Sequence, residues 1–224
     1  MKLSKRLKTI EQMITADYTH IWDCCCDHGS LGMSLLTHRT APNIHFVDIV
    51  PELMTKIDST LEQFFSKCPS IWTTHCLDVA KLPLTQYSGN HLIIIAGVGG
   101  DLMIEFINAI TKKYSELNID FLLCPIHHQF ALRKQLIKLD FNLKNEVLIE
   151  ENKRFYEVIL VNSTPLRNQK ISLVGDNIWQ SNNAEQADIA QRYLTKTLNH
   201  YRRIQQGNSE SVDYIIKNYL AVNI

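Results

Sequence analysis

Two acidic residues, Asp23 and Asp27, lie at the end of the β-rich segment 19–24 and in the turn that follows it, just before a helical pattern begins. A turn that binds pyrophosphate needs Gly-x-Gly-x-x-Gly so that backbone amides can approach the phosphates, and this turn lacks that pattern. Two carboxylates would repel phosphate, but they suit a ligand that carries ammonium and sulfonium charges. The alternative is that Asp27 and His28 only cap the helix.

Two further acidic residues lie at the carboxyl ends of the next two β-rich segments. Asp48 lies 19 residues after Gly29, close to the offset of about 20 residues at which an acidic side chain accepts hydrogen bonds from ribose hydroxyls. This spacing predicts a ligand that contains a nucleoside. Asp78 follows the segment 71–76, where it is placed to hold an exocyclic amine of adenine; the alternative is a turn aspartate that bonds its own backbone.

Three of the eight glycines, Gly97, Gly99 and Gly100, follow the apolar segment 91–96. Glycine is favoured where φ is positive or where another molecule lies against bare backbone, so we expect a ligand to cross this edge. The alternative, a tight turn into the next helix, explains one or two of these glycines but less easily all three. His127 and His128 follow the segment 119–124; they are candidates for bonding a base or a phosphate, or a solvated pair.

Short β-rich segments alternate with helical ones along the first two thirds of the chain, which predicts βαβ units and an α/β fold with a mostly parallel sheet. The segments 142–150 and 155–162 are joined by four residues, which suits a hairpin and predicts an antiparallel end of the sheet. We expect a domain over 1–162 and a helical region over 163–224, with helices at 184–206 and 211–220 around Gly207, Asn208 and Ser209. The other predicted helices are 3–16, 31–37, 52–65, 102–114 and 130–139, and the other predicted strands are 19–24, 43–49, 71–76, 91–96 and 119–124.

The composition excludes several classes of protein. Apolar runs are far shorter than the roughly 20 residues that span a bilayer, and the basic start is not followed by a signal-peptide core, so the expected location is cytoplasmic. Lysine plus arginine equals aspartate plus glutamate at 23 each, so any polyanion site must be a local patch. Three of the six cysteines are consecutive, Cys24 to Cys26, which indicates reduced, buried thiols, and no metal site is expected.

Four motifs in order resemble the bacterial tRNA adenine-22 N1-methyltransferases, a family of S-adenosyl-L-methionine-dependent enzymes with a class I, Rossmann-like domain and a helical C-terminal region. Residues 2–7 resemble the opening of that family, and Asp23–Leu31 fall on its Asp-Ile-Gly-Ser-Asp-His-Ala-Tyr-Leu signature. Residues 95–100 match its Ile-Ala-Gly-Met-Gly-Gly segment, and 146–151 with 156–158 match its closing hairpin. The resemblance covers 2–162 well and the remainder loosely.

The sequence departs from the family at two places. Cys25 stands where the family has glycine, and Cys124-Pro125-Ile126 replaces Gln-Pro-Asn near the expected target base, which removes two amides. His128 is retained. The helical tail is also shorter than in better-known members.

The resemblance implies a role for each candidate residue. The cofactor, S-adenosyl-L-methionine, is expected to contact Asp23, Asp27, Gly29, Asp48, Asp78, Ala96 and Gly97. Asp27 is the expected stabiliser of positive charge on the target adenine, with His28 as its orienting group or proton relay. The tRNA is expected to contact Gly99, Gly100, Pro125, His127, His128, Lys5, Arg6 and Arg133, with Lys8, Lys134, Arg154, Arg202 and Arg203 as further candidates for phosphate contacts.

Three other functions stay open at this point. The altered 124–126 segment and the zero net charge are compatible with methylation of another RNA site or of a small molecule. A nicotinamide-dependent dehydrogenase is disfavoured by the missing glycine-rich turn. A relative that binds cofactor and RNA without catalysis is the third.

Overall fold

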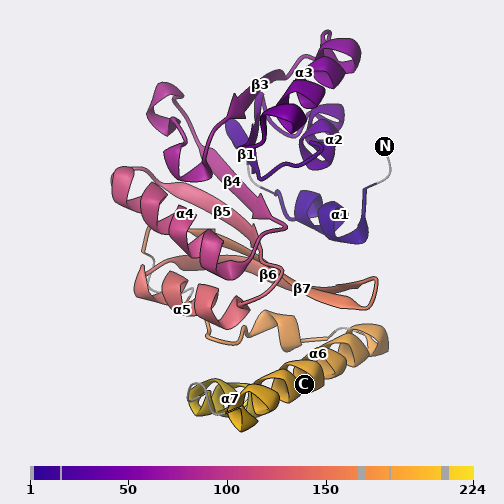
Figure 1. Ribbon diagram of the computed structural model, residues 1–224, viewed down its shortest axis with the longest axis vertical. Helices are drawn as coiled ribbons and strands as arrows, with labels where there is room; N and C mark the ends of the chain where they lie inside the picture. Colours follow the sequence, from indigo (N-terminus) through magenta and orange to yellow (C-terminus); the bar gives the residue numbers. More distant parts are fainter. Residues whose placement is uncertain (1–2, 16, 166–169, 182, 208–211) are drawn as a thin grey trace.

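The computed structural model describes residues 3–15, 17–165, 170–181, 183–207 and 212–224. A seven-stranded sheet runs through it in the order β3-β2-β1-β4-β5-β7-β6 (Figure 1). All pairs from β3 to β5 are parallel, and β7 pairs antiparallel with both β5 and β6. The strands are β1 (His20–Cys24), β2 (Asn43–Asp48), β3 (Ile71–Cys76), β4 (His91–Ala96), β5 (Ile119–Cys124), β6 (Asn142–Glu151) and β7 (Arg154–Asn162).

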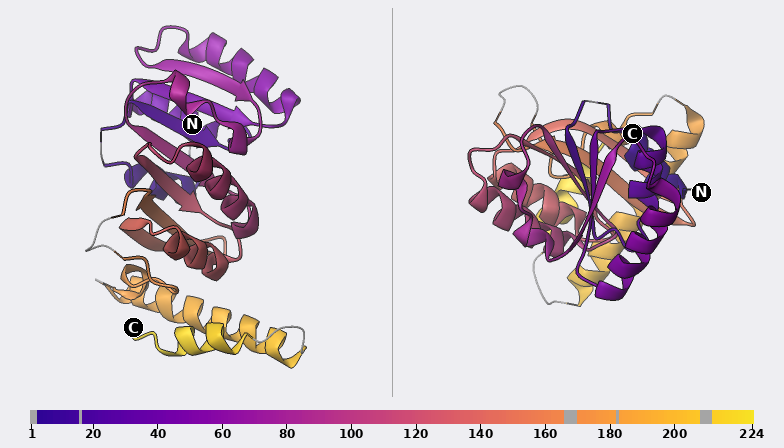
Figure 2. Two further views of the ribbon diagram at one scale, coloured as in Figure 1. Left: turned by 90° about the vertical axis from the view of Figure 1, so that its left-hand side faces the viewer. Right: turned by 90° about the horizontal axis from the view of Figure 1, so that it is seen from above.

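Helices cover both faces of this sheet (Figure 2). One apolar cluster joins the sheet to α1, α2 and α3, and another joins its opposite face to α4 and α5. Because both faces are buried, the parallel strands are apolar along almost their whole length. The helices are α1 (Lys5–Gln12), α2 (Ser30–His38), α3 (Pro51–Phe65), α4 (Gly100–Lys113), α5 (Gln129–Lys138), α6 (Ala184–Gln206) and α7 (Asp213–Leu220).

The predicted α/β class and the antiparallel end of the sheet are confirmed, and β4, β5 and α6 have the predicted bounds. Helix α1 is shorter than expected. Ser4 is its N-cap, whose side chain accepts a hydrogen bond from Leu7 N–H, and Met13 is its C-cap. Three short 3-10 helices, at 79–81, 84–86 and 177–179, were not expected. Residues 166–169, Asn208, Ser209 and Ser211, which carried parts of the predicted linkers and last helix, lie outside the described residues.

The carboxyl ends of the parallel strands meet along one edge. Cys24 of β1 is level with Val47 of β2 and with Ile95 of β4, and Ile95 is level with Leu123 of β5. The chain order reverses between β1 and β4, which is the position where open α/β sheets bind ligands. The loops with the candidate residues therefore leave the sheet side by side.

The connection from β3 to β4 contains two 3-10 helices and no α-helix. Histidine side chains from β1, β2 and β3 pack together on this part of the sheet. His45 stacks on Trp22 at 3.8 Å between ring centroids and hydrogen-bonds to both His20 and His75 at 3.0 Å. Desolvation is the main reason that the pKa of His45 is lowered to about 3, so these rings pack as neutral bases. None of these histidines is among the residues predicted from the sequence to be functional.

The C-terminal helices lie beneath the hairpin β6–β7 (Figure 1) and share an apolar cluster with Phe130 and Leu148. A buried ionic group joins the two parts. Arg133 contacts Glu157 and Glu146, each at 2.7 Å, and Tyr193 of α6 donates to Glu157 at 2.6 Å. Arg133 is fully buried, so the prediction that it contacts tRNA is wrong. Its position on α5 faces the interior, where its guanidinium pairs with the carboxylates of Glu146 and Glu157.

None of the described helices combines the length and apolar character needed to cross a bilayer.

Candidate functional site

The loop after β1 adopts an unusual backbone in which left-handed residues alternate. Cys25, Asp27 and Gly29 have φ of 55°, 51° and 67°. The loop is held by its own backbone, since Gly29 N–H donates to the Cys26 carbonyl at 2.7 Å, and by β2, since Cys26 N–H donates to the Val47 carbonyl at 3.1 Å. The positive φ at Cys25 gives a physical reason for glycine at this position in the resembling family.

Asp23 lies buried at the end of β1, and its carboxylate accepts a hydrogen bond from Gly32 N–H at 2.9 Å. Burial raises the pKa of Asp23 to about 7; the Gly32 hydrogen bond opposes this shift, and the charge of Asp48 adds to it. A cation beside Asp23 would favour the ionised carboxylate and offset the free energy that burial adds to its ionisation. Gly32 itself was not singled out from the sequence: a Cβ there would lie 2.3 Å from the Phe46 ring, so only glycine lets α2 reach Asp23.

Asp48 and Asp78 converge on the same loop. Asp48 accepts from Asp27 N–H and from Val50 N–H, each at 3.1 Å. Asp78 accepts from Ala80 N–H at 2.9 Å, the local turn contact that was weighed as its alternative role. The charges of Asp48, Asp23 and Asp78, together with the larger effect of burial, raise the pKa of the Cys25 thiol to about 12. Three of the predicted cofactor contacts thus lie beside the loop that contains a fourth, Asp27.

The proposed catalytic pair is open to solvent. Asp27 and His28 are both exposed, with 3.6 Å between Asp27 Oδ1 and His28 Nε2. Gly29 is different: it is buried, and a Cβ would lie 3.2 Å from Phe46, so its backbone shapes the start of α2.

The three glycines after β4 serve different purposes. A Cβ on Gly99 would lie 2.2 Å from the His127 ring, and one on Gly100 would lie 2.6 Å from the His128 carbonyl. These two glycines therefore let the loop after β5 pack against the start of α4. Of the three, only Gly97 is exposed, with φ of 87°, and the described atom closest to a Cβ there would belong to Arg6, at 3.9 Å. Ala96, the last residue of β4, is half-buried beside it.

The loop after β5 carries its histidines outward. Both His127 and His128 are exposed, and His128 Nδ1 contacts the Asp101 carboxylate at 2.5 Å. Cys124 and Pro125 are buried, so the departure at 124–126 exposes only Ile126. Pro125 therefore offers little surface to a substrate.

Arg6 brings a positive charge to the same edge from α1. Its guanidinium lies over the Tyr156 ring, 5.1 Å from the centroid. Its Nε is buried and has no hydrogen-bond partner in the described parts of the chain. Lys5 is exposed, and its backbone N–H donates to Glu151. Of the other phosphate candidates, Lys8, Lys134, Arg154, Arg202 and Arg203 are all exposed.

A cavity of about 460 Å³, here called the α6 cavity, opens between the loop after β5, the start of β7 and the two C-terminal helices. Most of its lining residues are not among the site residues predicted from the sequence. The available signal is that aromatic and basic residues recur along 193–203 at helical spacing and that Arg154-Phe155-Tyr156 begins a strand. Its lining comprises Ile126, His127, His128, Gln129, Arg154, Phe155, Tyr156, Tyr193, Lys196, Thr197, His200, Tyr201, Arg203 and Tyr219.

The described residues contain no group of three or more His, Cys, Asp or Glu side chains arranged to hold a metal ion. What the edge offers is a carboxylate-rich half, around Asp23, Asp48 and Asp78, and a half with Arg6 and the two histidines.

Solved structures with a similar fold cover nearly the whole chain. The TrmK of M. capricolum, in complex with S-adenosyl-homocysteine, matches 98% of this chain and 96% of its own with a TM-score of 0.76 and 18% identity. A putative tRNA (m1A22) methyltransferase from Streptococcus pneumoniae matches 98% and 95% with a TM-score of 0.74 and 18% identity. The M1A22 tRNA methyltransferase TrmK of B. subtilis matches 98% and 94% with a TM-score of 0.66 and 22% identity.

A comparison with curated protein sequences gives no match. The family model described as a methyltransferase domain matches residues 3–159. This match spans more than half of the chain and contains the loops after β1, β2, β3, β4 and β5, so the protein belongs to the methyltransferase-domain family.

Proposed function

We propose that this protein is an S-adenosyl-L-methionine-dependent methyltransferase that transfers a methyl group to N1 of an adenine in tRNA, at position 22, in the cytoplasm. The convergence of Asp23, Asp48 and Asp78 on the loop after β1 is the observation that carries the proposal. Asp48 accepts from Asp27 N–H of that loop, and Asp23 accepts from Gly32 N–H just after it. Leu77 N–H donates to the Asp48 carbonyl, which brings the next residue, Asp78, to the same place. It is supported by the family match and by the folds of neighbours described as tRNA (m1A22) methyltransferases.

The carboxylates fit the proposed cofactor. Each oxygen of Asp48 already accepts one backbone N–H and has a second lone pair for a ribose hydroxyl. Asp78 uses Oδ1 for Ala80, which leaves Oδ2 for the adenine amine. Asp23, whose buried carboxyl is costly to ionise, gains from an ammonium or sulfonium charge nearby. Ala96 and Gly97 would border the same ligand from β4.

When bound, S-adenosyl-L-methionine supplies an electrophilic methyl group on a sulfonium sulfur. Adenine N1 has a free lone pair at neutral pH, so the protein needs no strong base. Its residues have to hold the reacting atoms in line, which can contribute about 7–11 kcal/mol at best. They also have to stabilise the positive charge that develops on the purine; Asp27 is assigned that role, with His28 as its orienting neighbour.

Methylation of tRNA transcripts tests the proposal. We expect tritium from labelled cofactor to enter a transcript with adenine at position 22 and not one with guanine there, and nuclease digestion should yield 1-methyladenosine. Asp27→Asn should lower turnover even when the cofactor is saturating, at a concentration chosen from the Kd that calorimetry gives for this variant. Equal labelling of both transcripts would disprove the assigned position, and full turnover by Asp27→Asn would disprove its assigned role.

A methyltransferase that acts on another RNA site is the second candidate. It is favoured by Ile126, which is exposed at the rim where the resembling family has an amide. The same digestion, applied to total RNA from cells with and without the protein, distinguishes the two candidates by the position of the modified nucleotide.

A further inference from the structure

The α6 cavity lies at the same edge of the sheet as the candidate site. Its wall includes His127 and His128, whose loop packs on Gly99 and Gly100 at the start of α4. Its other walls come from β7 and from α6, so the C-terminal helices complete it. Its volume of about 460 Å³ is within the range of about 300–1,000 Å³ that is typical of small-molecule and cofactor sites.

The lining of this cavity is basic, although the chain as a whole is neutral. Arg154, Lys196 and Arg203 line it, together with three histidines, and no aspartate or glutamate is among the described residues that do so. The acidic groups beside the lining are already paired. Asp101 contacts His128 at 2.5 Å, Glu150 pairs with Arg192 at 2.6 Å, and Glu157 is buried with Arg133 at 2.7 Å. An anion is therefore the ligand that its charge favours.

Aromatic rings stand among these cations. Lys196 Nζ lies 5.3 Å from the centroid of Phe155. Tyr201 is half-buried in the wall, and its ring is backed by Tyr219 at 6.0 Å with an interplanar angle of 24°. Basic side chains that follow a phosphate backbone, combined with rings on which bases stack, are the features of single-stranded nucleic-acid sites.

Arg6 and Tyr156 connect the cavity with the candidate site. Tyr156 lines the cavity, and Arg6 lies over its ring. Among the described residues, the same guanidinium is the group nearest to a Cβ built on Gly97, at 3.9 Å. Arg6 Nε, buried without a partner in the described parts of the chain, is a donor placed between the two. A polynucleotide that crosses Gly97 would meet Arg6 and then the cavity.

We infer that the α6 cavity binds a nucleotide that neighbours the target adenine in the RNA, its base stacked on Tyr201 and its phosphates held by Lys196 and Arg203. This inference rests on the proposed function and adds to it the place where the substrate is held. Taking the target base out of its stack also costs its neighbours a stacking partner, and a second pocket in which one of them stacks would offset part of that free energy.

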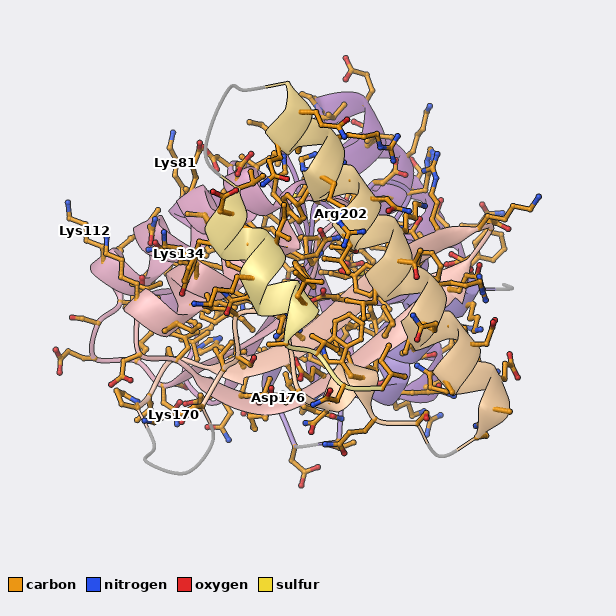
Figure 3. All side chains as sticks on the ribbon, turned by 90° about the horizontal axis from the view of Figure 1, so that it is seen from below. Lys81, Lys112, Lys134, Lys170, Asp176 and Arg202 are labelled. Atoms are coloured by element: carbon orange, nitrogen blue, oxygen red, sulfur yellow. The ribbon has the colours of Figure 1, made fainter. Side chains whose placement is uncertain are left out.

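Charge-removing variants test the phosphate contacts. Lys196→Gln combined with Arg203→Gln should raise the Kd for tRNA about tenfold and reduce the slope of log Kd against log salt by about 1.5. The control is Lys112→Gln with Lys170→Gln, which removes the same charge from two exposed lysines that Figure 3 shows at the margin of the molecule, away from α6. We expect the control variant to have the Kd for tRNA and the salt dependence of the wild type.

Substituting the ring tests the stacking. With 2-aminopurine placed beside the target adenine in the tRNA, binding should quench its fluorescence in the wild type and in Tyr201→Phe, but not in Tyr201→Leu. Tyr201→Leu should also weaken binding about tenfold. Because Tyr201 packs on Tyr219, thermal melting checks the fold, and His200→Ala, at an exposed cavity position, provides a second variant that should weaken binding without altering the fold.

The outcomes separate the two proposals. If the wild type methylates tRNA and the cavity variants behave like the control, the inference is wrong and the proposed function stands. If the wild type transfers no methyl group but binds RNA with the expected variant pattern, the proposed function is wrong and the cavity is an RNA site. If the wild type neither transfers a methyl group nor binds tRNA, both are wrong.

Discussion

The backbone N–H of Asp27 donates a hydrogen bond to the carboxylate of Asp48 at 3.1 Å, which joins the loop after β1 to the end of β2. Asp48 therefore has two functions: it holds the loop that carries the proposed catalytic residue, and it presents acceptors for a ribose. Loss of its charge should affect both.

Asp48→Asn keeps the shape of the side chain but removes its charge. We expect the Kd for S-adenosyl-L-methionine, measured by calorimetry, to rise about 10- to 100-fold, because hydrogen bonds to a charged acceptor contribute about 1.5–3 kcal/mol. Glu52→Gln, at an exposed position in the first turn of α3, is the matched control and should bind as the wild type does. An unchanged Kd for Asp48→Asn would rule out the ribose assignment.

Cofactor binding should depend on pH through Asp23. Its pKa is raised to about 7 in the free protein, so below pH 7 the carboxyl holds a proton that has to leave before it can pair with a cation. We expect affinity to fall by up to about tenfold per pH unit below 7 and to level off above it. Asp23→Asn should bind more weakly at pH 8 and lack this dependence; a wild-type affinity that is constant from pH 5.5 to 8 would contradict the assignment.

Cys25 should cost stability through its backbone rather than its thiol. A residue with a Cβ at φ of 55° is disfavoured by about 1–2 kcal/mol. Both Cys25→Gly and Cys25→Ala remove the sulfur, but only glycine removes the Cβ. Chemical denaturation should therefore show Cys25→Gly to be about 1 kcal/mol more stable than Cys25→Ala. The reverse order would mean that the loop is not held in this conformation.

Much of this site could be predicted from the sequence because it depends on strand ends. Asp48 ends one clear β-rich segment and Asp78 follows another. Because parallel strands bring their carboxyl ends to one edge, the local sequence pattern was sufficient to predict that these two residues lie near each other. The purpose of Gly99 and Gly100 was not predictable in the same way. The ring of His127, which packs on Gly99, comes from a loop that is distant in sequence. A glycine that makes room for such packing and a glycine that makes room for a ligand look the same in the sequence.

Arg133 and the α6 cavity show where the sequence is insufficient. Arg133 follows Leu132 on α5, and charge alone favours a surface position for it. Its burial depends on Glu146 and Glu157, which lie in the hairpin β6–β7 that follows α5 in the chain. The cavity likewise needs α6 to pack against β7, a contact that the helical pattern of 184–206 does not specify.

The buried ionic group should be essential for stability. Arg133→Met would leave Glu146 and Glu157 buried without their cation, which typically costs 3–5 kcal/mol. Lys134→Met, the next residue and exposed, should change the free energy of unfolding by less than about 0.5 kcal/mol. Urea denaturation measures both. A small effect of Arg133→Met would mean that the C-terminal helices are held to the sheet by apolar contacts alone.

The central claim is that the carboxylate-rich edge holds S-adenosyl-L-methionine for transfer to adenine N1 in tRNA. The most direct measurement is mass spectrometry of a tRNA transcript after incubation with protein and cofactor carrying a deuterated methyl group. The account predicts deuterated 1-methyladenosine at position 22, made by the wild type and lost in Asp48→Asn at low cofactor concentration. Label at another nucleotide, or no label in RNA although the cofactor binds, would contradict it.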